Sequence, residues 1–185
     1  MSYYIEISCA LTVGLVFLAA ALGKSSRKSS YRAFVESVKL IRFVPAGTVK
    51  LTATTTIVLE FAVGLLPILT FARSDGSAVI RAALFGLTLL LAGAFMVVIL
   101  VSIRTKVSVP CRCFGGDADN LGIRHVVRNA LLFLTAAAGA TFAMVVPSYD
   151  VELPGVILAG GAGTISAVLL INYDAIVDLF ALQSR

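Results

Sequence analysis

Two cysteines separated by a single residue, Cys111 and Cys113, are the side chains best suited to chemistry in this chain. A disulfide across one intervening residue closes a very small ring, so the bond is strained and easily reduced. Arg112 lies between the thiols, where positive charge favours the reactive thiolate, and Phe114 and Gly115 allow a tight turn. The pattern predicts a redox pair: one thiolate attacks a disulfide of a partner protein, and the other resolves the mixed intermediate.

A metal site and an inert cysteine pair are the two alternatives to redox exchange. Zinc sites typically have Cys-x2-Cys spacing and a second ligand pair, and the chain has neither. No metal is therefore expected, although a ligand set would be available in Cys111, Cys113, His125 and Asp117 or Asp119.

The composition predicts that nearly everything else is embedded in a lipid bilayer. Of the 185 residues, 59% are hydrophobic and only 14% are charged, which a soluble globule could not cover with polar surface. A bilayer requires about 20 apolar residues per helix. We expect one all-α integral membrane domain over residues 1–185, with four to five spans at about 5–22, 48–71, 79–103, 125–146 and 155–173. The segment at about 30–44 has the 3.6-residue period of an amphipathic helix at the membrane surface.

The distribution of positive charge predicts the orientation. With five spans, thirteen of the fifteen Lys and Arg residues fall on one side, and only Arg73 and Arg81 fall on the other. The positive-inside rule places the crowded side in the cytoplasm. The Cys-x-Cys loop is then cytoplasmic and the N-terminus is outside. Arg124 and Arg128 belong to the crowded side and add positive charge near the thiols. Clustered in this way, the charges favour contact with anionic lipid, and no nucleic-acid motif is present.

Glu60 is an acidic residue near the middle of the second predicted span. An ionised carboxylate at that depth costs about 3 kcal/mol or more on insertion scales. It is therefore expected to be protonated, paired or exposed to a wet cavity. The functional alternatives are a proton relay or an internal ion pair, and the structural one is a neutral carboxyl bonded to a hydroxyl of a neighbouring helix.

These motifs together resemble the MauE branch of the MauE/DoxX-type redox-associated membrane proteins, over about residues 10–135. The fifth span, 155–173, lies outside the resemblance. The family usually has Gly between the cysteines, where this chain has Arg112. The segments that carry the resemblance are Ala21-Leu22-Gly23-Lys24, Phe34, Pro45, Glu60-Phe61-Ala62-Val63-Gly64, Cys111-Arg112-Cys113-Phe114-Gly115 and Arg128-Asn129-Ala130-Leu131-Leu132.

The resemblance implies a redox accessory protein of methylamine utilisation in the plasma membrane. Cys111 and Cys113 would exchange thiols with a thioredoxin-like or disulfide-containing partner, and Lys24 and Glu60 would be polar elements of the bundle. The family's maturation of a disulfide-rich methylamine dehydrogenase subunit takes place outside the cytoplasm, whereas the charge count puts the pair inside. Either electrons come from cytoplasmic thiols, or the partner differs, or the span count is different. The alternative function is a non-catalytic scaffold that binds a partner protein or a quinone-like lipophile between its helices.

Overall fold

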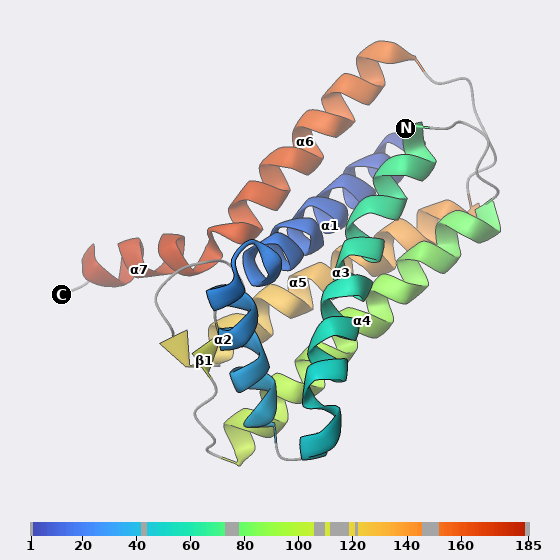
Figure 1. Ribbon diagram of the computed structural model, residues 1–185. Helices are drawn as coiled ribbons and strands as arrows, with labels where there is room; N and C mark the ends of the chain where they lie inside the picture. The colour runs from blue at the N-terminus through green and yellow to red at the C-terminus, as the bar shows by residue number, and fades with distance from the viewer. Residues whose placement is uncertain are drawn as a thin grey trace.

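The computed structural model describes residues 2–41, 44–72, 78–105, 110–111, 119–120, 122–145 and 152–183, and they form a helical bundle (Figure 1). The elements in chain order are α1 (Ser2–Ser25), α2 (Lys28–Lys39), the 3-10 turn η1 (Ala46–Thr48), α3 (Val49–Ala72), α4 (Ala78–Arg104), β1 (Pro110–Cys111), β2 (Asp119–Asn120), α5 (Ile123–Val145), α6 (Leu153–Ile171) and α7 (Tyr173–Gln183).

Five helices of the described chain are long and apolar enough to cross a membrane, which confirms the predicted all-α, multi-pass architecture. They are α1, α3, α4, α5 and α6, and their bounds lie within a few residues of the predicted spans. Because consecutive spans run in opposite directions, the two ends of the bundle carry different elements. One end holds the last turn of α1, then α2, β1, the start of α5, and α7 (Figure 1). We call this the cysteine end, and the opposite end, which holds Tyr3, the Tyr3 end.

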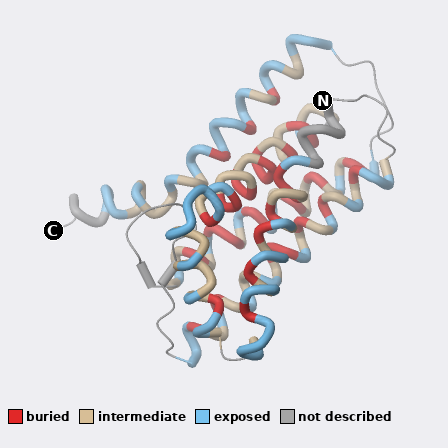
Figure 2. Tube along the Cα trace, viewed as in Figure 1, coloured by how far each residue is buried: buried red, intermediate tan, exposed pale blue. Residues whose placement is uncertain are grey.

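Helix α1 is the central element of the bundle. It packs against α3, α5 and α6, while α4 packs mainly against α5. Figure 2 shows buried positions along α1 and on the inward faces of its neighbours, whereas most of α6 is exposed on the outside of the bundle. In a membrane, those exposed apolar faces contact lipid. The core side chains include Val13, Val16, Phe17, Val63, Phe85, Leu91 and Leu132.

Small residues allow α1 to approach its neighbours closely. A Cβ added at Gly64 of α3 would lie only 2.9 Å from the backbone nitrogen of Leu18. At Gly163 of α6 it would lie 2.7 Å from the carbonyl oxygen of Ser8. The Thr12 hydroxyl also donates to the Gly163 carbonyl oxygen at 3.1 Å. Backbones this close are typical of membrane helix pairs, in which packing and interhelical hydrogen bonds stabilise association.

The amphipathic helix expected at about 30–44 is α2, which spans Lys28–Lys39. Its apolar side packs against the first turns of α3, where Val38 meets Val49 and Ala53. Much of the apolar face is therefore covered by protein, and the basic face, with Arg32 and Lys39, is exposed.

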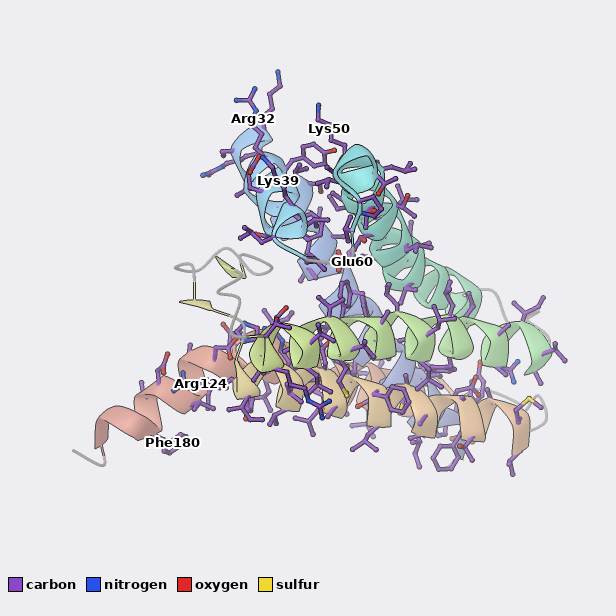
Figure 3. All side chains as sticks on the ribbon, turned by 90° about the horizontal axis from the view of Figure 1, so that it is seen from below. Arg32, Lys39, Lys50, Glu60, Arg124 and Phe180 are labelled. Atoms are coloured by element: carbon purple, nitrogen blue, oxygen red, sulfur yellow. The ribbon has the colours of Figure 1, made fainter. Side chains whose placement is uncertain are left out.

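Helix α7 is an element that the sequence analysis did not identify. The chain turns at Asn172 after α6 and continues as a helix through Tyr173–Gln183, beyond the last predicted span at 155–173. Two ion pairs hold α7 against the start of α5: Arg124 with Asp178, and Arg128 with Asp174. The cysteine end is thus bordered by α2 on one side and α7 on another (Figure 3).

Candidate functional site at the cysteine end

The segment that carries the cysteine motif connects α4 to α5 and is closed at its base by two short strands. Strands β1 and β2 pair antiparallel, with Pro110 opposite Asn120 and Cys111 opposite Asp119. The backbone of Cys111 is therefore held at the base of the connection. Arg112, Cys113, Phe114 and Gly115 lie outside the described residues, so their predicted roles stay predictions.

Strand β1 lies against α2, so the amphipathic helix contacts the segment that begins the motif. In Figure 3 the two strands lie between α2 and the side of the bundle formed by α5 and α7. This position is at the edge of the bundle and outside the packed core.

The arginines that were expected to favour the thiolate have carboxylate partners. Nη1 of Arg128 lies 3.2 Å from Oδ2 of Asp174, and Arg124 is paired with Asp178. Arg128 is only 6% exposed, so this ion pair is largely shielded from solvent. The effect of the two arginines on the thiols stays a prediction, because Cys113 lies outside the described residues.

Asn129 and His125 form the buried start of α5. Nδ2 of Asn129 donates to the carbonyl oxygen of His125 at 2.8 Å. The backbone N–H of Gly122 in turn donates to Nδ1 of His125 at 3.4 Å. These bonds stay within the first turns of α5, where the helix has backbone groups without intrahelical partners. Asn129 thus stabilises the helix that follows the motif.

Lys24 and Glu60 form a buried ion pair between α1 and α3. Their side chains are 2% and 1% exposed, so the pair is almost completely removed from solvent. The Lys24 ammonium also lies 5.1 Å from the ring centre of Phe34 on α2 and 5.3 Å from that of Phe95 on α4. An internal ion pair was one of the alternatives for Glu60, and the structure shows that pair. Side chains of four helices therefore meet at this ammonium, which makes it the junction between α2 and the membrane spans.

A second buried ion pair, near the Tyr3 end, was missed by the sequence analysis. Nε of Arg81 on α4 lies 2.8 Å from Oε1 of Glu6 on α1, with exposures of 6% and 0%. The guanidinium carbon also lies 6.0 Å from the ring centre of Tyr3. In the sequence, Glu6 and Arg81 are each a charged residue within an apolar run, and this is the signal that could have identified them. Their separation of 75 positions in the chain hid the pairing.

The structure also bears on where a metal or a quinone-like molecule could be held. Within the described part of the chain, no three His, Cys, Asp or Glu side chains are gathered closely enough to hold a metal ion. Cys113, which the metal alternative requires, and Asp117, one of its two possible carboxylate ligands, are outside that part. A cavity at the cysteine end is lined by α2, the last residue of α1 and the start of α3.

Comparison with known proteins identifies the family. The model of the family described as methylamine utilisation protein MauE matches residues 1–142, which extends beyond the segment of resemblance at both ends. The matched residues contain α1 to α4, both strands and most of α5, and they stop short of α6 and α7. No curated protein and no solved structure gives a significant match. The chain is a multi-pass membrane protein that belongs to the MauE family, a family associated with methylamine utilisation.

Proposed function

We propose that the protein is a membrane thiol–disulfide redox accessory protein of the MauE type, with Cys111 and Cys113 as the exchanging pair. The observation that carries the proposal is the position of Cys111 at the closed base of a connection at the bundle edge, against α2. Cys113 follows after one intervening residue in the printed sequence. Family membership supports the proposal, since the motif lies within the matched residues.

The exchange involves two sulfur atoms on each protein. The thiolate of one cysteine attacks a disulfide sulfur of the partner, forming a mixed disulfide and releasing the partner's other sulfur as a thiolate. The second cysteine then attacks its neighbour's sulfur in the mixed disulfide, which closes the Cys111–Cys113 bond and releases the partner as a dithiol. The pair thereby loses two electrons and two protons, and the partner gains both. The reverse sequence transfers a disulfide to the partner.

The partner is a thioredoxin-like or disulfide-containing protein that reaches the cysteine end. The charge distribution supports a cytoplasmic location for this end and an outside location for the N-terminus. The five candidate spans agree with the span count on which that orientation is based. With that count, either electrons enter from cytoplasmic thiols, or the partner differs from a methylamine dehydrogenase-like enzyme.

Lys24 and Glu60 have a positioning role in this proposal. Their ion pair joins α1 to α3, and the Lys24 ammonium contacts Phe34 on α2, the helix that lies against β1. A chain of packed contacts therefore runs from the spans to the base of the motif. Loss of the Lys24–Glu60 ion pair is expected to change the thiol reactivity of Cys111 and Cys113, although both cysteines are still present.

The test uses Cys113→Ser, with Cys9→Ser as the matched control, because Cys9 lies within α1 near the opposite end. With its resolving thiol removed, the protein is expected to accumulate a mixed disulfide with its partner, visible as a reducible adduct on a non-reducing gel. Cys9→Ser should form no more adduct than the unaltered protein. If Cys111→Ser/Cys113→Ser supports growth that depends on the protein as well as wild type does, the non-catalytic scaffold is correct instead.

The side of the membrane is tested separately with a membrane-impermeant maleimide. Cys111 and Cys113 should react in inverted vesicles and be protected in intact cells. Strong labelling in intact cells would reverse the proposed orientation while leaving the redox chemistry in place.

A further inference from the structure

A cavity of about 580 Å³ opens at the cysteine end between the start of α2 and the start of α3. Four of its lining side chains are basic: Arg27, Lys28 and Arg32 from α2 or its N-cap, and Lys50 from α3. In the part of the chain that the structure describes, none of the four takes part in an ion pair that would neutralise it. The cavity therefore gathers positive charge from two helices at the level where the chain leaves the bilayer.

The acidic lining residue does not cancel this charge. Glu36 lines the same cavity, and its Oε2 lies 3.6 Å from Nζ of Lys39 on the next turn of α2. Lys39 is not part of the lining, so Glu36 has a cation of its own. Four basic side chains therefore face one carboxylate that is already engaged.

The start of α2 adds to the attraction for an anion. Arg27 is the N-cap residue, and its side chain makes no capping hydrogen bond. The first backbone N–H groups of a helix have no intrahelical partners, and the helix dipole places partial positive charge there. A phosphate group is suited to such a position, and basic side chains around it strengthen the binding.

The lining is also partly apolar, which distinguishes a lipid from a free anion. Val35 and the Tyr31 ring line the cavity beside the basic groups, and the Tyr31 hydroxyl is hydrogen-bonded to Thr54 of α3 at 2.9 Å. That bond holds the ring in place across the two helices. Figure 3 shows Arg32 and Lys50 extending from α2 and α3 in the same direction, away from the bundle.

We propose that this cavity binds the phosphate-bearing headgroup of one anionic phospholipid, such as phosphatidylglycerol, with the headgroup among Arg27, Lys28, Arg32 and Lys50. The glycerol and the first part of an acyl chain contact Tyr31 and Val35. The site is independent of the thiol–disulfide chemistry, since it contains no cysteine. Its occupation neutralises the basic residues and holds α2 against α3.

The test is native mass spectrometry of the full-length protein released from phosphatidylcholine nanodiscs that contain increasing fractions of phosphatidylglycerol. The test variant is Arg32→Gln, and Lys28→Gln/Arg32→Gln extends it. The matched control, Arg104→Gln, removes the same single charge from the same end of the bundle outside the cavity. Each basic residue that contacts the headgroup is expected to contribute about fivefold to binding, so Arg32→Gln should retain the lipid roughly fivefold less well and the double variant roughly 25-fold less well. The control should stay within about twofold of wild type, and so should the charge-keeping Arg32→Lys.

Two outcomes would overturn the proposal. Equal losses in the test and control variants would mean that the bundle end attracts anionic lipid diffusely, without a site. Displacement of the retained lipid by millimolar inorganic phosphate would mean that the cavity takes free phosphate and that the apolar lining contributes nothing. Helical content measured by circular dichroism on the same samples ensures that a loss is not due to unfolding.

Discussion

The two buried ion pairs of α1 lie near its opposite ends and differ in what they connect. Lys24 and Glu60 join α1 to α3, and the rings of Phe34 and Phe95 bring α2 and α4 to the same ammonium. Glu6 and Arg81 join α1 to α4, with the Tyr3 ring beside the guanidinium. The first pair thus contacts α2, which lies against β1, whereas the second lies near the Tyr3 end.

The two ion pairs therefore illustrate two roles of buried charge: stabilising the bundle, and linking the spans to an element outside them. Both pairs are costly to remove from water, and each specifies which helices must lie side by side. The pair at the cysteine end also contacts α2, an element outside the membrane spans. We therefore expect both pairs to affect stability and only Lys24–Glu60 to affect the cysteines. The variants below test that division.

The largest expected effect is the loss of one partner at Lys24–Glu60. Glu60→Leu leaves a buried ammonium without its carboxylate and should lower the free energy of unfolding by about 3–5 kcal/mol. Lys24→Met/Glu60→Leu removes both charges and should recover most of that loss. Reversible unfolding in mixed micelles measures both. If the double variant were as unstable as Glu60→Leu, the instability would not come from leaving the Lys24 ammonium unpaired.

The next variants compare the two pairs directly. Arg81→Met leaves the buried carboxylate of Glu6 without its cation and should cost on the order of 3 kcal/mol of unfolding free energy. For thiol reactivity the matched variants are the two doubles, Glu6→Leu/Arg81→Met and Lys24→Met/Glu60→Leu. The rate of maleimide labelling of Cys111 should change only in the second, which loses the contact between the ammonium and Phe34. Equal changes in both would remove the proposed link through α2.

Gly64 tests the same difference between the two ion pairs through helix packing, with every charge left in place. It lies one turn after Glu60 on α3, and a Cβ there would come within 2.9 Å of the Leu18 backbone of α1. Gly64→Ala should therefore separate α1 from α3, at a cost of about 1–3 kcal/mol, and disturb Lys24–Glu60 without touching Glu6–Arg81. Gly86→Ala is the control, because an added Cβ meets nothing within 4 Å. Thermal unfolding of the two variants in the same detergent should differ clearly.

The smallest effect is expected at the exposed pair between α5 and α7. Arg124 and Asp178 are 37% and 53% exposed, so Asp178→Asn should lower the unfolding free energy by no more than about 1 kcal/mol. Asp174→Asn should cost more, because its partner Arg128 is only 6% exposed. Unfolding measured at low and high salt checks the assignment, since only the exposed pair is screened. If Asp178→Asn cost more than Asp174→Asn, burial would not determine how much each ion pair stabilises the protein.

The spans were predictable from sequence because each depends on local hydropathy alone. Long apolar runs with few charges identify α1, α3, α4, α5 and α6, and the family motif identifies the position of the cysteine pair. Helix α7 was missed because its apolar residues, among them Leu179 and Phe180, are too few to form a span and are interrupted by Asp174 and Asp178. Its ion pairs are with arginines of α5, which are far away in the sequence.

Pairing across the bundle was less predictable than the presence of the paired residues. Glu60 was expected to need a partner because of its depth, and the ion pair with Lys24 satisfies that need. Glu6 and Arg81 lie close to the ends of their spans, where a charge can reach water, so nothing local required a partner. For the same reason the sequence did not indicate that Arg124 and Arg128 pair with Asp178 and Asp174, which lie about 50 residues further along the chain.

The position of Glu6 and Lys24 on α1 has a consequence for biogenesis. During synthesis α1 enters the bilayer before Glu60 of α3 and Arg81 of α4 have been made, so neither of its charges has a partner at that stage. Because the two residues stand near opposite ends of the helix, each side chain can extend to the nearer headgroup layer. Insertion of the later helices then draws both charges inward, so that assembly of the bundle is accompanied by a transfer of charge from lipid surface to protein interior.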